Sequence, residues 1–119
     1  MPTSMMLVFS KPTSAETEAA YNRWYSEKHI HDVAKVAGVI SATRYRLEKG
    51  VALLPGISGD HRGYLAIYEL EGKNQQELDA FAGALRQALA TGAADIDPTL
   101  DMQDISASLA VPITPRVSA

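Results

Sequence analysis

The sequence contains no cysteine in its 119 residues. This absence excludes disulfides, thiolate nucleophiles and cysteine-ligated metal sites. An excess of positive charge is also absent, since the formal net charge is −3 and the basic residues form no run. Nucleic acids and anionic membranes both require a basic surface, so we expect neither as a general partner.

Long apolar runs are absent as well. No stretch approaches the roughly 20 apolar residues of a membrane span, and residues 1–9 lack the basic start and long apolar centre of a signal peptide. Glycine-rich phosphate loops and the Gly-x-Ser-x-Gly elbow of serine hydrolases are missing too. We therefore expect a soluble, cytoplasmic protein, and a nucleotide cofactor or nucleophilic catalysis has little support.

The composition that is present suits one packed domain over residues 1–119. Hydrophobic residues make up 46% and charged residues 21%, which is typical of a chain that buries a core. The length matches a single ordinary domain. A core of this size is modest, so association with a second copy would add useful buried area.

The pattern of apolar residues predicts six elements. Strands are indicated by short runs rich in β-branched and aromatic residues. The first helix starts near a Thr13 or Ser14 cap, and the second lies between a capping box at Asn74 and Glu77 and a stop at Gly92. The expected strands cover residues 5–9, 39–47, 64–70 and 102–111, and the first helix continues to about residue 29 or a little beyond.

The resulting order, β-α-β-β-α-β, predicts an α+β, ferredoxin-like fold. Its four-stranded antiparallel sheet carries both helices on one face. The other face needs a cover, and a second subunit is the simplest one, which would make the protein a homodimer enclosing a small barrel. Candidates for that uncovered face are Tyr45, Leu47, Tyr64, Tyr68, Leu109 and Val111.

The first helix also resembles a known family. Residues 21–33, Tyr-Asn-Arg-Trp-Tyr-Ser-Glu-Lys-His-Ile-His-Asp-Val, and the passage from Gly38 to Arg46 are similar to EthD-like proteins of the dimeric α+β-barrel superfamily. The resemblance implies a pocket between sheet and helices. It also implies small, often aromatic or polyketide-like, substrates and a cofactor-free lyase, cyclase, dehydratase or monooxygenase activity, although some relatives in the superfamily bind haem.

Three residues of this segment form the candidate catalytic group: Tyr25, His29 and Asp32. Histidine can take up and return a proton near neutral pH, which suits enolisation, elimination or ring closure. Helical spacing places the three side chains on one face. We expect His29 to act as general acid and base, Asp32 to orient its ring, and Tyr25 to donate to an oxyanion. The alternative is that His29 only packs at a helix end.

Neighbouring residues allow several interpretations. Asp32 can instead be the N-cap of a short helix over residues 33–37. Trp24, although a substrate-binding candidate, fits the core better, because large aromatic residues on a helix stripe usually pack there. His31 lies on a different face from His29 and is expected to be exposed.

The substrate-binding candidates outside the first helix are Arg44, His61, Tyr64 and Tyr68. The two tyrosines share one strand face and either line the cavity or pack under the helices. Arg44 and Arg46 also share a face, where they either bind a carboxylate or phenolate or form exposed ion pairs. His61 reaches into a pocket mouth or is an ordinary surface residue.

We expect no metal or cofactor, because the three histidines do not converge at ligand spacing. The apolar, glycine-containing segment 51–62 is either a lid or part of the dimer interface. The favoured function is a cofactor-free lyase or isomerase acting on a small oxygenated or aromatic metabolite. The alternatives are a monooxygenase, cofactor-free or with haem bound by His29 or His61, and a non-catalytic small-molecule-binding or stress-related dimer.

Overall fold

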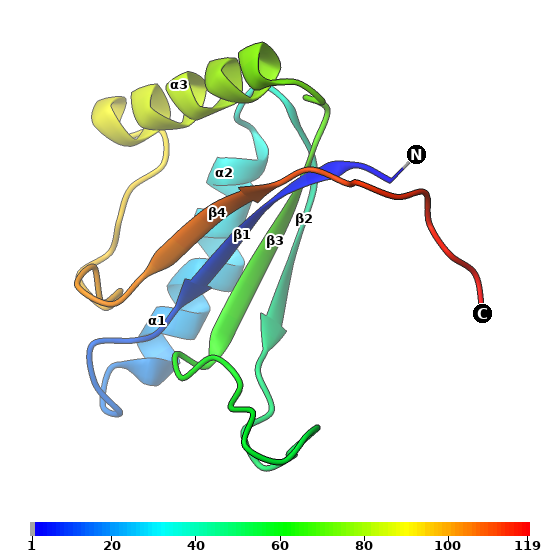
Figure 1. Cartoon of the computed structure of the whole chain (residues 1–119). Coiled ribbons are helices and arrows are strands. Elements are labelled where there is room, and N and C mark those ends of the chain that lie inside the picture. Colours follow the sequence, from blue (N-terminus) through cyan, green and yellow to red (C-terminus); the bar gives the residue numbers. More distant parts are fainter. Residues whose placement is uncertain (1) are drawn as a thin grey trace.

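The computed structural model describes residues 2–119, and its elements follow the expected order (Figure 1). The first helical segment is continuous but has three parts, α1, the π-helical turn η1 and α2, and the second helix is α3. The elements are β1 (Ser4–Ser10), α1 (Glu18–Trp24), η1 (Tyr25–His29), α2 (Ile30–Ala34), β2 (Val39–Arg46), β3 (Tyr64–Leu70), α3 (Gln75–Thr91) and β4 (Ser106–Ala110).

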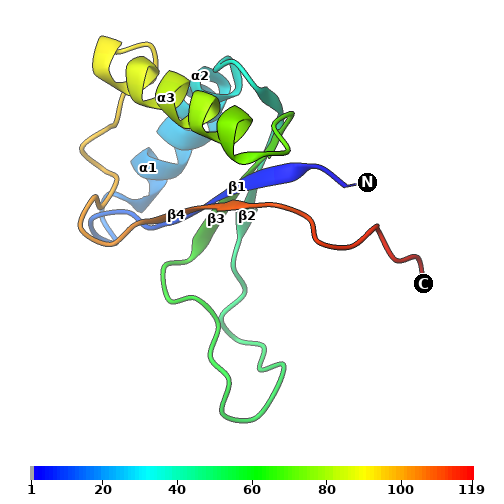
Figure 2. The ribbon, with the colours of Figure 1, turned by 45° about the horizontal axis from the view of Figure 1, so that its top comes forward.

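The four strands form one antiparallel sheet in the order β2-β3-β1-β4. Both helical segments lie on the same face of this sheet (Figure 2). The α+β, ferredoxin-like fold expected from the sequence is therefore confirmed. The strand β4 is shorter than expected because residues 102–104 form a turn, beside which the Asp101 side chain accepts a hydrogen bond from the Gln103 amide at 2.9 Å.

The helix-facing side of the sheet carries the core. Alternate residues of β1 and β3 point toward the helices and are buried, as the period of two in a strand requires. They pack against side chains of α1, η1, α2 and α3 and form the core between the helices and the sheet. The buried apolar residues are Met6, Val8, Tyr21, Tyr25, Val33, Val36, Ala66, Tyr68, Leu70, Leu78, Phe81, Ala94 and Leu100.

The ends of α3 follow the sequence signals. The Asn74 side chain accepts a hydrogen bond from the Glu77 amide at 2.9 Å, so the predicted cap is formed. Gly92 adopts a φ of 81°, a left-handed conformation that suits glycine, and the helix stops there. Both predicted limits of this helix are confirmed.

The π-helical turn η1 joins α1 to α2 and carries two of the functional candidates. Tyr25 and His29 bound this turn, and both are buried. Residues four apart lie on the same face of a helix, so both side chains face the sheet. The wider turn holds one residue more than an α-helical turn.

The second sheet face carries no helix (Figure 2). Directly paired residues share a face, and Leu109 pairs with the buried Met6. Leu109 therefore points to the helix side, as do Tyr64 and Tyr68, so assigning these three to the uncovered face was wrong. Tyr45 does lie on that face. The uncovered face presents Met5, Leu7, Phe9, Ser41, Thr43, Tyr45, Leu65, Ile67, Glu69, Ser106, Ser108 and Ala110.

The segment between β2 and β3, residues 47–63, projects from the sheet on the side away from the helices (Figure 2). Its apolar side chains are exposed, Leu53 to 87% and Ile57 to 64%. The segment does not cover the helix side of the sheet. Within residues 2–119, no helix has both the length and the apolar character needed to cross a membrane.

Candidate functional site

Most of the predicted site residues meet between the first helical segment and the sheet. Side chains from α1 and η1 point down onto side chains from β2 and β3, and their rings pack edge to face or tilted. We call this group the aromatic cluster. Its members are Tyr21, Trp24, Tyr25, His29, Arg44, Tyr64 and Tyr68.

His29 is buried, with 6% of its surface exposed. Its Nδ1 lies 3.0 Å from the backbone carbonyl oxygen of Asp95, in the loop between α3 and β4. A carbonyl oxygen can only accept, so Nδ1 carries the proton. Nε2 makes no hydrogen bond within residues 2–119, so the neutral ring presents a bare lone pair there. Burial lowers the pKa of His29 below 6.5, which favours this neutral form.

Two aromatic side chains hold the imidazole ring in place. The Trp24 indole stacks on it with ring centroids 4.6 Å apart and planes 28° from parallel. The Tyr25 ring meets it edge-on, at 4.9 Å and 88°. Together with the Asp95 bond, these contacts fix the direction in which Nε2 points. Trp24 thus packs in the layer and also supports His29.

Asp32 does not take the position expected of it. Its carboxylate accepts a hydrogen bond from Lys28 Nζ at 2.8 Å, and this bond lowers the pKa of Asp32. The alternative role as an N-cap is wrong, because Asp32 lies inside α2. We expected Asp32, in the same helix, to orient the His29 ring, whereas the backbone carbonyl of Asp95 makes that contact.

Tyr25 and Tyr68 form the buried floor of the cluster. Their hydroxyl oxygens are 3.5 Å apart, and their side chains are 2% and 1% exposed. Burial raises the pKa of Tyr68 and raises that of Tyr25 well above its usual value. Both therefore remain protonated phenols at neutral pH and can donate. Of the two alternatives for Tyr68, packing under the helices is the one observed.

Arg44 brings a positive charge into the cluster. Its guanidinium carbon lies 4.3 Å from the centre of the Tyr25 ring and 5.2 Å from that of Tyr64. It donates hydrogen bonds to Ser26 Oγ at 2.8 Å and to Asn22 Oδ1 at 3.1 Å. Within the described residues 2–119, no carboxylate oxygen lies within 4.0 Å of its nitrogens. Arg44 is thus held by neutral partners only.

Tyr64 stands at the outer edge of the cluster. Its hydroxyl donates to Glu18 Oε2 at 2.6 Å and accepts from Asn22 Nδ2 at 2.9 Å. Partial burial raises the pKa of Tyr64, so the proton stays on the phenol. Glu18 is the acceptor of that hydrogen bond. Tyr64 therefore links the aromatic cluster to charged groups at the end of the sheet.

His61 and Arg46 are not part of the cluster. His61 Nε2 lies 2.7 Å from Asp104 Oδ2, and its side chain is 65% exposed. Arg46 forms an exposed ion pair with Glu48 at 2.7 Å. Both residues form surface contacts, and both also line the pocket described below. His31 is exposed as expected.

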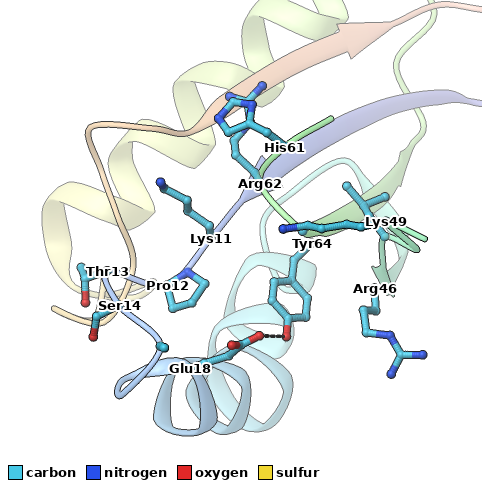
Figure 3. Close-up of a pocket in the computed structure, with 13 residues that line it drawn as sticks. Lys11, Pro12, Thr13, Ser14, Glu18, Arg46, Lys49, His61, Arg62 and Tyr64 are labelled. Atoms are coloured by element: carbon cyan, nitrogen blue, oxygen red, sulfur yellow. Dashed lines mark hydrogen bonds between the residues drawn. The ribbon is translucent and has the colours of Figure 1, made fainter. Parts of the chain in front are cut away.

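A pocket of about 540 Å³ opens at the end of the sheet, outside the cluster (Figure 3). We call it the end pocket. It adjoins the cluster only through Tyr64, and of the other predicted site residues His61 alone lines it. The lining residues are Lys11, Pro12, Thr13, Ser14, Ala15, Glu18, Arg46, Leu47, Lys49, His61, Arg62, Gly63 and Tyr64.

Sequence reasoning missed three contributors, Glu18, Asn22 and Asp95. Glu18 and Asn22 are four residues apart and share a helix face beside the tyrosines. Their i, i+4 spacing could therefore have predicted that they lie next to each other near the site. Asp95 acts through its backbone oxygen, 66 positions from His29, and no sequence pattern indicates such a contact. In residues 2–119, no group of three or more histidine, aspartate or glutamate residues is arranged to hold a metal ion.

Comparisons with known proteins agree with the fold. No family model matches the sequence, and no curated protein matches it. Among solved structures, an ethyl tert-butyl ether D (EthD) family protein from Bacillus halodurans aligns with a TM-score of 0.53 and 10% identity, covering 95% of this chain and 100% of that one. HapK from Hahella chejuensis aligns with a TM-score of 0.51 and 13% identity, covering 98% and 99%. At these identities the likeness extends to architecture alone: the chain has the α+β, ferredoxin-like fold found in the EthD-family structure.

Proposed function

We propose that the protein is a cofactor-independent lyase or isomerase that moves a proton on a small oxygenated or aromatic metabolite. His29 is the general base, and its Nε2 accepts a proton from carbon or oxygen of the substrate. The same imidazolium then returns the proton to another atom of the substrate or to the leaving group. No redox step is needed, and the residues invoked are all members of the aromatic cluster.

The hydrogen bond from His29 Nδ1 to the Asp95 carbonyl carries this proposal. It leaves Nε2 as the only basic nitrogen, and burial keeps the ring neutral. A neutral imidazole with a fixed tautomer is ready to accept a proton at pH 7. Two ring contacts hold its orientation, so little reorganisation precedes the transfer.

Arg44 supplies a positive charge and Tyr25 a hydrogen-bond donor that complement the base. When the substrate loses a proton to Nε2, negative charge develops on its oxygen. The Arg44 guanidinium carbon and the His29 ring lie 4.3 Å and 4.9 Å from the centre of the same Tyr25 ring. The guanidinium has no carboxylate partner, and the Tyr25 phenol keeps its proton. Both can therefore stabilise an enolate or phenolate close to the base.

Access to the base is narrow. His29 is 6% exposed, and the end pocket adjoins the cluster at Tyr64 and not at His29. In residues 2–119, Nε2 is not among the fully buried side-chain atoms without a hydrogen-bond partner, so it reaches solvent through the small exposed part of the ring. An opening of this size favours a small, flat substrate, in agreement with an aromatic or oxygenated metabolite.

The test compares His29→Gln with His31→Gln, a matched control two residues away on the exposed side. The protein is incubated in D₂O with a panel of aromatic ketones and β-dicarbonyl compounds, and deuterium incorporation or product is followed by proton NMR. We expect His29→Gln to lower turnover by about 10²- to 10⁴-fold and the control to leave it unchanged.

Equal turnover in wild type and His29→Gln would contradict the role of His29. Oxygen consumption that accompanies product formation would replace the proposal with the monooxygenase alternative. A ligand that raises the melting temperature while no member of the panel exchanges or reacts would replace it with the binding-protein alternative.

We also propose that a second copy of the chain covers the uncovered sheet face. That face carries Leu7, Phe9, Leu65 and Ile67 on the two central strands. The segment 47–63 projects on the same side, with Leu53 almost fully exposed. Apolar surface on both features favours burial against a partner, and the two faces of identical sheets are self-complementary across a two-fold axis.

A further inference from the structure

The end pocket gathers charge from segments far apart in the sequence. The cationic side chains come from the residue after β1, from the end of β2 and from the segment 47–63, while α1 contributes one carboxylate (Figure 3). Permanent cations on its wall are Lys11, Arg46, Lys49 and Arg62, against the single acid Glu18. The volume of about 540 Å³ is within the usual range for small-molecule sites.

Three of these cations are already paired with acids, Arg46 with Glu48 as described above. Lys11 Nζ lies 3.3 Å from Asp104, and Arg62 Nη2 lies 2.8 Å from Asp60. The hydrogen bonds from Arg62 lower the pKa of Asp60 to about 2, so this pair stays charged throughout the neutral range. Lys11 and Arg62 therefore shape the wall and carry little unmatched charge.

Lys49 is the unmatched cation. Arg46 is paired with Glu48 at 2.7 Å, whereas no carboxylate in residues 2–119 lies within 4.0 Å of Lys49 Nζ. The ammonium lies beside Gly63, since a Cβ added there would be 3.6 Å away, an ordinary van der Waals distance. Figure 3 shows the Lys49 side chain reaching across toward Tyr64. An ammonium in this position is available to a ligand anion.

The pocket floor offers an acceptor. Glu18 Oε2 accepts the Tyr64 hydroxyl at 2.6 Å, and a carboxylate has further lone pairs for a second donor. Pro12, Leu47 and the Tyr64 ring supply apolar surface to the pocket wall. The pocket therefore combines a cation, an apolar wall and a hydrogen-bond acceptor.

We propose that the end pocket binds a small aromatic hydroxycarboxylate, with the carboxylate at Lys49, the ring on the apolar wall and the hydroxyl on Glu18. A phosphate group fits less well, because the Glu18 carboxylate opposes a dianion and no glycine-rich loop offers backbone amides. Since His29 does not line this pocket, the site stands independently of the proton-transfer role proposed above.

The test measures binding by calorimetry at low salt with 4-hydroxybenzoate, 4-hydroxybenzamide, benzoate and inorganic phosphate as probes. We expect 4-hydroxybenzoate to bind most tightly and the neutral amide to bind about five- to tenfold more weakly. Lys49→Met removes the charge but keeps the apolar stem, and it should weaken 4-hydroxybenzoate by a similar factor. Lys73→Met, an exposed lysine outside the pocket, should leave the affinity unchanged.

A second variant, Glu18→Ala, tests whether the Glu18 carboxylate accepts a hydrogen bond from the ligand hydroxyl. It should remove the preference for 4-hydroxybenzoate over benzoate, because the acceptor of the ligand hydroxyl is gone. The proposal is overturned if the amide binds as tightly as the acid, if phosphate binds most tightly, if Lys49→Met behaves like Lys73→Met, or if wild-type protein binds none of the probes. None of these readouts requires turnover, so they are independent of the His29 test.

Discussion

The imidazole Nδ1 of His29 and the backbone oxygen of Asp95 are 3.0 Å apart, although 66 positions separate the two residues in the chain. This bond predicts a single neutral tautomer of His29, protonated at Nδ1. Nitrogen-15 NMR of the side chains at pH 8 should show Nδ1 with the shift of a protonated nitrogen and Nε2 with that of a bare one. The exposed His31 supplies the control, since averaging between tautomers is expected there. The opposite tautomer at His29 would remove the structural basis of the proposed base.

The lowered pKa of His29 predicts a particular dependence of stability on pH. Well above pH 6.5 the ring is neutral in both the folded and the unfolded chain, so the titration of His29 takes nothing from the free energy of unfolding. As the pH falls below 6.5, the unfolded chain takes up the proton first, so the free energy of unfolding declines until the pH passes the folded pKa. Urea unfolding between pH 5 and pH 8 measures this slope.

The variant His29→Gln isolates that contribution. It should flatten the part of the profile below pH 6.5, whereas His31→Gln should keep the wild-type slope. Identical slopes in all three proteins would mean that burial does not lower the pKa of His29.

The two buried tyrosines of the first helical segment predict a contrast in stability. Tyr21 shares a hydrogen bond with Ser10 Oγ at 2.5 Å, whereas the hydroxyls of Tyr25 and Tyr68 are 3.5 Å apart. Tyr21→Phe leaves a buried serine hydroxyl without its partner and should cost about 1–3 kcal/mol. Tyr25→Phe removes a much weaker contact and should cost less than about 1 kcal/mol.

Thermal or urea unfolding of the two phenylalanine variants measures this contrast, with circular dichroism to show that the fold is kept. The pair is matched, since each change deletes one hydroxyl from a buried ring of the same cluster. The interpretation fails if Tyr25→Phe is the more destabilising of the two.

The uncovered sheet face predicts a dimer. Ile67 lies on a central strand of that face, so Ile67→Lys should convert dimers to monomers by placing a charge in the interface. Leu89→Lys, on the outer side of α3, provides a control with a similar change in charge. Sedimentation velocity measures the distribution of the two species. A wild-type protein that sediments as a monomer at all concentrations would contradict the proposed partner.

Local signals account for the parts of the fold that sequence reasoning predicted. The run Tyr64–Leu70 alternates between two faces and became β3, and the Asn74 cap and Gly92 define α3. These signals involve residues within a few positions of each other. The order of elements then leaves few topologies for a chain of this length.

The candidate site was predicted less completely because its decisive contacts are long-range. His29 was recognisable from its residue type and from the resemblance, but its partner is a main-chain atom in a distant loop. The Glu18–Tyr64 bond joins residues 46 positions apart, so the end pocket could not be inferred before the strands were placed. Asp32 illustrates the converse error, because a neighbour at i+3 was available on the helix but pairs with Lys28.

The turn Tyr25–His29 holds five residues in a wider helix, so it absorbs one residue more than an α-helical turn. Deleting one exposed residue from it, such as Glu27, would let the segment wind as an ordinary α-helix. The helical parts before and after the deletion would then keep their faces toward the sheet, because the wide turn and the α turn it replaces each complete about one revolution. The spacing from Tyr25 to His29 would fall from four residues to three. A one-residue deletion in this turn therefore separates the position of the imidazole from the stability of the fold.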